Sequence, residues 1–301
     1  MHLLGLAAVV GAAALFGLIG PALHAAGDLG LGPLAVPLAR AVGATAVTAL
    51  IALHLRPRCL LSPFRAPRVG FLSGFFGVFG IYAATNYGML HVPLALAVTL
   101  FYTAPLWVLL LGHLWGKEPF STRAAVAAAI ALVGIRISLG VSDGAERHWL
   151  GMAAMVAGGI SYAAHILLGR YGPAATDPLG SYLATFFWGS VILLPLALAT
   201  GELPALLRAP SRAWLPLGYL IVGPTLGSYG LLLFALRHIE GRVASILSMT
   251  EIAFAAFWGF VFLDQRPALS VWIGAATIVV AVVILTRPTR ASRPPTASNS
   301  E

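Results

Sequence analysis

The chain has 301 residues, of which 59% are hydrophobic and only 9% are charged, and its formal net charge is +8. Soluble domains carry about 25% charged residues, so this composition excludes an ordinary water-soluble protein. The basic residues lie in short loops between apolar runs, which favours membrane topology over nucleic-acid binding. Cys59 is the single cysteine, which excludes a disulfide framework and a cysteine-based metal site.

The apolar runs predict ten membrane-spanning helices. A spanning helix needs about 20 mainly apolar residues, and in lipid it satisfies its backbone hydrogen bonds within the segment. We therefore expect an all-α integral membrane protein. The first run could instead be a signal peptide, but no Lys or Arg precedes it. The predicted spans are residues 4–25, 33–54, 69–90, 94–115, 122–141, 150–169, 178–199, 214–236, 242–263 and 269–286.

The sequence repeats itself once, at a nearly constant offset. Gly5-Leu-Ala-Ala-Val-Val10 matches Gly151-Met-Ala-Ala-Met-Val156 at an offset of 146 residues. Pro105 and Glu118 are 13 residues apart, and so are Glu251 and Asp264. We therefore predict two five-helix repeats, residues 1–143 and 144–287. Five is an odd number, so the second repeat must cross the membrane in the opposite direction to the first.

The distribution of positive charge predicts the topology. With the N-terminus in the cytoplasm, 12 Lys and Arg residues fall in cytoplasmic segments and 4 in outer loops. Because positive charge stays inside, both termini should be cytoplasmic in a multi-pass protein of the cell (inner) membrane. Residues 288–301 are polar and rich in Pro and Ser, and they predict a disordered cytoplasmic tail. Inverted repeats are a common plan of secondary transporters, with the solute bound between them.

Two stretches resemble the EamA-type branch of the drug/metabolite transporter superfamily. In residues 101–118, Pro105 and Glu118 stand where the family's fourth helix has an early Pro and a terminal Glu. Residues 250–266 are similar to the ninth-helix pattern Thr-Glu-Pro-Val-Phe-Ala-Ala, which ends in Gly-Glu-Arg. The matching residues of that stretch are Thr250, Glu251, Phe254, Ala255, Ala256 and Arg266.

The resemblance extends over essentially residues 1–287, and it includes Arg40, which matches a common second-helix Arg of the family. Two departures stand out. Ile252 replaces the family's Pro, which predicts a straighter ninth helix, and Asp264-Gln265 replaces Gly-Glu.

The resemblance implies a secondary carrier that moves small metabolites across the cytoplasmic membrane, often outward, without ATP. The chain agrees, since it lacks the G-x-x-x-x-G-K-[ST] phosphate loop. We expect no cofactor or metal, and a small solute and the lipid bilayer as partners. A lipid-carrier flippase of related fold stays an alternative. A membrane-embedded enzyme is less favoured, because the eight His residues are scattered and no H-E-x-x-H or G-x-S-x-G occurs.

Glu251 and Arg40 are the two charges predicted deep in the membrane. An ionisable residue at that depth marks a functional site by default. Glu251 could bind a substrate amine or exchange a proton, and the alternative is a structural carboxyl bonded to a neighbouring helix. Arg40 could bind a substrate carboxylate, pair with Glu251 or bond helix-end carbonyls, and a structural clamp is an equal alternative. Together they would suit a zwitterion such as an amino acid.

Other polar and aromatic residues of the predicted spans are candidates for solute binding or proton coupling. Of these we favour Asn86, because an amide in lipid needs partners. For His165, a packing role is at least as well supported as a proton relay. The other main candidates are Tyr102, Thr103, Trp107, Tyr162 and Ser248. Further residues that could face a cavity are Tyr82, Ser161, Tyr182, Trp188, Ser228, Tyr229 and Trp258.

Prolines predict where helices bend, because Pro removes an intrahelical hydrogen bond. Pro21, Pro37, Pro105, Pro195 and Gly223-Pro224 interrupt apolar runs, and we take Pro105, Gly223 and Pro224 as hinge candidates. Glu118 and Asp264 lie where helices end. We expect them to accept hydrogen bonds from a nearby helix N-terminus, for example that of the following helix, and so to serve structure or gating.

Overall fold

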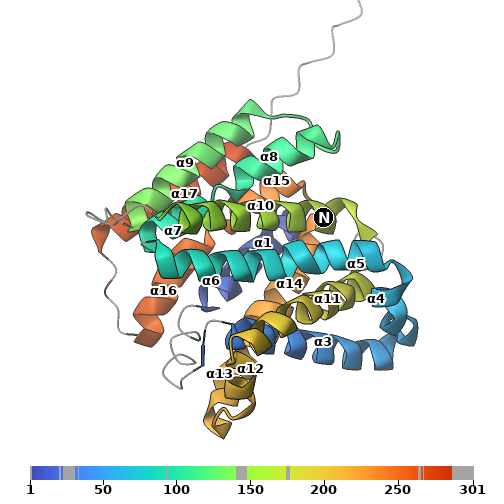
Figure 1. Ribbon diagram of the computed structural model, residues 1–301. Coiled ribbons are helices and arrows are strands. Elements are labelled where there is room, and N and C mark those ends of the chain that lie inside the picture. The colour runs from blue at the N-terminus through green and yellow to red at the C-terminus, as the bar shows by residue number, and fades with distance from the viewer. Residues whose placement is uncertain are drawn as a thin grey trace, which may run out of the picture.

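A computed structural model describes the parts of the chain given at the end of this paragraph, and across them the protein forms only helices and their connections (Figure 1). Asp264 and the predicted tail at 288–301 fall outside the described residues. The described parts are residues 2–19, 22, 31–32, 34–92, 94–139, 148–173, 177–263, 266 and 268–286.

The first repeat supplies five helical segments, and the third and fourth of them are each assembled from consecutive pieces. Short helices at Pro57–Leu61 and Ser62–Arg65 (α4) lead into the third segment. The segments are α1 (His2–Gly17), α3 (Ala35–Leu55), α5 to α6 (Pro67–Gly74, Phe75–Gly80 and Ile81–His91), α7 with α8 (Leu94–Phe101 and Ala104–Leu114) and α9 (Thr122–Leu139).

The second repeat follows the same plan. Short helices at Glu202–Leu207 (α12) and Ser211–Ala213 precede its third segment. The segments are α10 (Trp149–Tyr171), α11 (Pro178–Ala199), α13 to α14 (Trp214–Leu220, Ile221–Gly227 and Ser228–Leu236), α15 with α16 (Gly241–Ser248 and Glu251–Leu263) and α17 (Leu269–Thr286).

Nine of these segments are, within the described residues, long and apolar enough to cross a membrane, and α1 is a shorter apolar helix. Their bounds agree closely with the predicted spans from the second onward. The protein is therefore an all-α membrane protein of two inverted repeats. Figure 1 shows α9 beside α17 and α3 beside α11, so segments of the two repeats pack against each other.

The ten segments are called helices one to ten in chain order, so helix four is α7 with α8 and helix nine is α15 with α16. Both of these helices are interrupted, at Tyr102–Thr103 and at Met249–Thr250. At each interruption a threonine hydroxyl donates to the carbonyl three residues earlier, Thr103 to Leu100 at 2.7 Å and Thr250 to Leu247 at 2.8 Å. Such side-chain bonds offer carbonyls near a break a partner other than the helix. The ninth helix thus breaks without a proline, and a straighter course than in the family's other members stays a prediction.

The other prolines behave differently from expectation. Pro195 lies inside the continuous helix α11 and Pro37 lies in the first turns of α3, so neither proline ends a helix, and Pro21 falls outside the described residues. Pro224 lies in a π-helical segment, Ile221–Gly227, and a second such segment occupies Phe75–Gly80, one repeat offset earlier. In a π-helix each backbone hydrogen bond spans five residues instead of four, so the turn is wider, and such turns often mark a functional position.

Small residues allow close contact between the repeats. A side-chain carbon added to Gly74 would lie 2.6 Å from the backbone nitrogen of Gly189 in α11. One added to Gly134 in α9 would lie 2.8 Å from the carbonyl oxygen of Gly274 in α17. Membrane helices approach this closely only where small residues face each other, and the gain is van der Waals packing.

Candidate functional site

A cavity of about 890 Å³ lies between the two repeats, and we call it the central cavity. It reaches the face of the bundle away from the beginning of α1, since Gly32, Met89, Leu139 and Arg266 near that face line it. We call the face at which α1 begins and α17 ends the terminal face. The cavity wall is mostly apolar, with side chains that include Phe16, Ile19, Val36, Ile81, Val98, Phe101 and Ile252.

Arg40 brings a positive charge to this cavity. Its side chain is buried, and its guanidinium carbon lies 5.1 Å from the centre of the Tyr82 ring, a cation–π contact. Its Nε donates to the Thr225 hydroxyl at 2.9 Å, and that hydroxyl donates in turn to the Leu220 carbonyl at 2.7 Å. In the described structure Nε is the one guanidinium nitrogen with a hydrogen bond, so the terminal nitrogens are available to a ligand.

Thr225 owes its position to the π-helical segment. Its hydroxyl bonds a carbonyl five residues earlier, and its own carbonyl accepts from the Tyr182 hydroxyl at 2.7 Å. The residue has no exposed surface. Thr225 of the second repeat is therefore held in place by the π-helical turn, and it holds the side chain of Arg40 from the first repeat.

Glu251 brings a negative charge to the same cavity, at the first residue of α16. The Tyr102 hydroxyl lies against its carboxyl, and Tyr162 also interacts with it electrostatically. A carboxylate beside the N-terminus of a helix is stabilised by the helix dipole and by the unpaired backbone N–H groups. The interruption before α16 therefore creates a favourable place for a charge at membrane depth.

Arg40 and Glu251 form no ion pair with each other, although both belong to the described residues and line one cavity. Each contacts hydroxyls or aromatic rings, and the Arg40 charge also acts on Glu251 electrostatically. The arrangement leaves a cationic group and an anionic group on one largely apolar wall. A ligand with complementary ends could satisfy both charges at once.

Three further predicted residues line the central cavity, namely Asn86, Tyr102 and Tyr162. Thr103 and Trp107 do not line it, and they bond to each other, with the indole nitrogen donating to the threonine hydroxyl at 3.1 Å.

Ser248 and His165 also lie off the cavity wall. Ser248 is buried behind Tyr162 and donates to the Ala244 carbonyl at 2.8 Å. His165 lines a separate pocket on the other side of the bundle.

The hinge candidates also lie away from the cavity wall. Pro105 is in the first turn of α8, directly after the Tyr102–Thr103 interruption. Gly223 and Pro224 belong to the π-helical segment that presents Thr225.

Glu118 joins the two repeats at the terminal face. Its carboxylate accepts from the backbone N–H groups of Gly241 at 2.7 Å and Arg242 at 3.3 Å, and from the Tyr171 hydroxyl at 2.9 Å. The carboxylate thus caps the N-terminus of α15. The expectation that it accepts from a helix N-terminus holds, but the helix is in the other repeat and is not the following one, α9.

Tyr82, one of the residues expected to face a cavity, lines the central cavity, and its buried hydroxyl has no hydrogen-bond partner in the described structure. Two residues of the site were not among the predicted candidates, namely Thr225, which holds Arg40, and Arg266, which lies at the cavity's exposed end. Thr225 directly follows Gly223-Pro224, which is the sequence signal that could have identified it. Among the described residues no cluster of His, Cys, Asp and Glu could hold a metal.

The EamA-like transporter family model matches residues 3–140 and again 149–287, once for each repeat. The chain belongs to the EamA-like transporter family. The protein is therefore a multi-pass member of a transporter family. The match of one family unit to each half agrees with the repeated helices and with the two π-helical segments at one offset.

Individual relatives share a minority of residues. An uncharacterized transporter of Archaeoglobus fulgidus is 27% identical over 237 residues, 78% of this chain and 82% of that protein. A probable terminal-alkyne amino-acid exporter of Streptantibioticus cattleyicolor is 28% identical over 289 residues, 91% and 90% of the two chains. A solved crystal structure with 18% identity superposes with a TM-score of 0.76 over 94% of this chain and 96% of its own. This likeness supports the fold.

Proposed function

We propose that the protein exports a small zwitterion with an apolar side chain, such as an amino acid, through the central cavity. The observation that carries this proposal is the separation of Arg40 and Glu251 on one largely apolar wall without an ion pair. A carboxylate would bind the Arg40 guanidinium, an ammonium would bind Glu251, and the apolar wall would receive the side chain.

The size of the cavity and the relatives support this class of solute. Sites for small molecules range over about 300–1,000 Å³, and the cavity, at about 890 Å³, is ample for one amino acid. The relative from Streptantibioticus cattleyicolor is named as a probable amino-acid exporter. Both observations favour an amino-acid-like solute over a bulky lipid carrier.

The proposed direction follows from the charge distribution. Positive residues concentrate in the segments that share the terminal face, which supports a cytoplasmic side of the cell membrane for that face and for both termini. The central cavity then opens outward. In this state the solute can leave to the outside.

We also propose that export is coupled to protons through Glu251. It is the one carboxyl group among the described residues that line the cavity. A proton and a solute ammonium would compete for this carboxylate, so a proton arriving from outside releases the solute outward. An acidic exterior should therefore drive export.

The change between outward-open and inward-open states requires the repeats, residues 1–143 and 144–287, to move against each other. The interruptions before Pro105 and Glu251 are the places where half-helices can turn. The π-helical segment that contains Gly223 and Pro224 is a third. These positions border the site, so movement at them can couple to its occupancy.

Reconstituted protein tests the proposal. Proteoliposomes should take up labelled leucine and related apolar amino acids above empty vesicles, and faster with a pH gradient acidic on the side to which the solute is released. Arg40→Ala and Glu251→Gln should each remove this uptake while the protein still elutes as a single species. Uptake of none of a panel of amino acids, with or without the gradient, would contradict the proposed solute class.

A further inference from the structure

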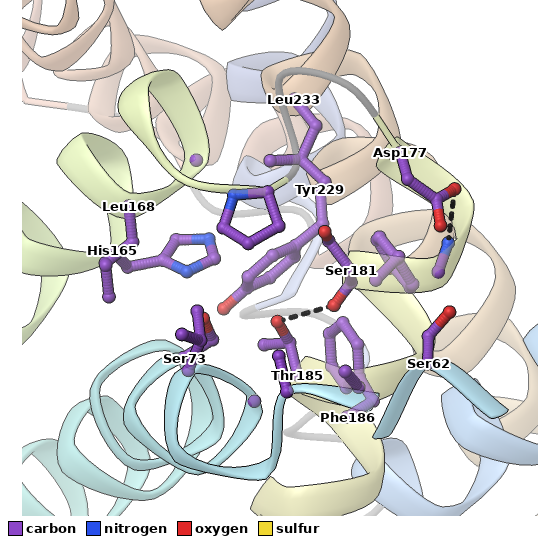
Figure 2. A pocket seen from close by; sticks show the side chains of 18 of the residues that line it. Ser62, Ser73, His165, Leu168, Asp177, Ser181, Thr185, Phe186, Tyr229 and Leu233 are labelled. Carbon is purple, nitrogen blue, oxygen red and sulfur yellow. Dashed lines mark hydrogen bonds between the residues drawn. The ribbon is translucent and has the colours of Figure 1, made fainter. Parts of the chain in front are cut away.

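A second pocket, of about 160 Å³, opens on the terminal face, away from the mouth of the central cavity. We call it the terminal-face pocket. Ser62, Arg65 and Asp177 line its rim, close to the short helices and turns of that face. Figure 2 shows its interior, where His165, Ser73, Thr185 and Tyr229 surround one space.

His165 has an unsatisfied polar atom at the inner end of this pocket. The side chain is 5% exposed, and its Nε2 has no hydrogen-bond partner in the described structure. The ring is held in place, since it lies 5.2 Å from the Tyr229 ring, and a side-chain carbon on Gly77 would come within 2.5 Å of its Nδ1. Buried polar atoms are rarely left unpaired in native proteins, so a polar group brought into the pocket could satisfy this nitrogen.

The pocket is the inverted counterpart of the central cavity. His165 lies 146 residues after Ile19, and Thr185 lies 145 residues after Arg40, both of which line the central cavity. The pocket therefore uses helices six, seven and eight where the central cavity uses helices one, two and three. Its walls carry hydroxyls and an imidazole where the cavity has an alkyl chain and a guanidinium.

Tyr229 belongs to the walls of both spaces. Its hydroxyl donates to the Gly77 carbonyl at 3.3 Å. Its ring makes edge contacts with Phe16, at 5.5 Å between centres, and with Phe186, at 5.3 Å. One aromatic side chain with a single hydrogen bond thus stands between the two spaces.

We propose that the terminal-face pocket is a cytoplasmic loading subsite for the transported zwitterion. The carboxylate of the solute enters past Arg65, and one polar end of the solute bonds to His165 Nε2. Tyr229 is the gate between this pocket and the central cavity. This inference rests on the proposed function for the identity of the solute. The position and water access of the pocket can be tested without any solute.

The first experiment uses thiol labelling in a Cys59→Ala background, which has no other cysteine. Ser73 lines the pocket, and its neighbour Leu72 is 45% exposed on the outside of the bundle and does not line the pocket. A charged, membrane-impermeant methanethiosulfonate applied to the cytoplasmic face should modify S73C at least about tenfold faster than L72C, because charged reagents do not react from lipid. Equal rates, or faster labelling of L72C, would overturn the pocket.

The second experiment tests binding with labelled leucine. In His165→Ala, the KM for transport from the cytoplasmic face should rise about tenfold, as expected for one lost hydrogen bond, and the KM from the outer face should stay within twofold. His165→Gln, which keeps a hydrogen-bonding group, should restore part of the loss. Leucine should also slow S73C labelling in the protein that retains His165. Equal changes at both faces, or none, would overturn the subsite.

The two experiments separate the failures. If the wild-type protein transports no amino acid while S73C still reacts faster than L72C, the proposed function fails and the water-filled pocket stands without its assigned ligand. If leucine is transported but S73C is no more reactive than L72C, the proposed function stands and this inference fails.

Discussion

Helices four and nine are the same element in two copies, and they differ at the residue that follows the break. Both are interrupted after about eight residues, and both interruptions carry a threonine that bonds back to the preceding turn. After the break, helix four continues with Ala104, which is fully buried, and helix nine continues with Glu251, which lines the central cavity. The repeat thus supplies one backbone geometry twice but a charge only once.

Helices two and seven, the second helices of the two repeats, also share a position in the fold but differ in charge. Arg40 of helix two occupies the position that Thr185 has in helix seven. Arg40 lines the central cavity, and Thr185 lines the terminal-face pocket and donates to its own helix at the Ser181 carbonyl, 2.8 Å away. The two repeats therefore share one backbone plan, and the charged residues of the proposed solute site stand where the repeats differ.

The largest effect is expected from Glu251→Gln, which removes the charge directly after the break in helix nine, where helix four has the uncharged Ala104. Removing one partner from a buried charge contact costs about 2–5 kcal/mol, so transport of labelled leucine should fall about 100-fold and lose its response to a pH gradient. Proteoliposome uptake measures both. Glu240→Gln is the matched control, since Glu240 is a surface partner of Arg242, and it should transport normally. Unchanged transport in E251Q at every pH would refute the charged site.

The next effect concerns the support of Arg40. Thr225→Val keeps the shape of the side chain but removes the hydroxyl that accepts from Arg40 Nε. We expect the KM for leucine to rise about tenfold, because a hydrogen bond to a charged group contributes about 1.5–3 kcal/mol. Thr48→Val is a control in the same helix as Arg40, with a buried hydroxyl that has no partner in the described structure. A similar rise in both variants would assign the effect to packing.

A smaller effect is expected when Pro105 is replaced. Helix nine has Ile252 two residues after its threonine Thr250, where helix four has Pro105 two residues after Thr103, so the proline is not required for the break. Pro105→Ala should lower the transport rate less than about threefold, whereas Thr103→Val, which removes the bond to Leu100, should lower it more. Initial uptake rates compare the two. A greater loss in P105A than in T103V would show that the halves break for different reasons.

The smallest effect concerns Cys59, which lies outside the spanning segments. Burial, together with the neighbouring Asp177 carboxylate, raises the pKa of its thiol. The reactive thiolate is then scarcer at pH 7 than for a free cysteine, and more of it forms as the pH rises. N-ethylmaleimide should modify Cys59 slowly at pH 7 and faster at pH 9, as mass spectrometry can follow. Rapid modification at pH 7 would show that this turn opens readily.

The sequence predicted the spanning helices, their inversion and the transporter family, because hydropathy and a repeat offset are properties of whole segments. It did not predict how helix nine breaks, since the relevant contact is a threonine hydroxyl and not a proline. It also could not place His165 in a different space from Glu251, because depth in a span does not say which side of the bundle a side chain faces. Thr225 escaped notice for a related reason, since its role arises from a π-helical turn and from a contact 185 residues distant along the chain.

The most direct test of the central claim uses three labelled probes of one shape: leucine, its analogue without the amino group, and its analogue without the carboxyl group. Competition of the probes for leucine binding should be measured on the wild type, E251Q and Arg40→Gln. The account predicts that leucine binds the wild type best, that E251Q loses the advantage conferred by the ammonium, and that Arg40→Gln loses the advantage conferred by the carboxylate. Equal losses for all three probes in either variant would contradict a site with one residue for each end of the solute.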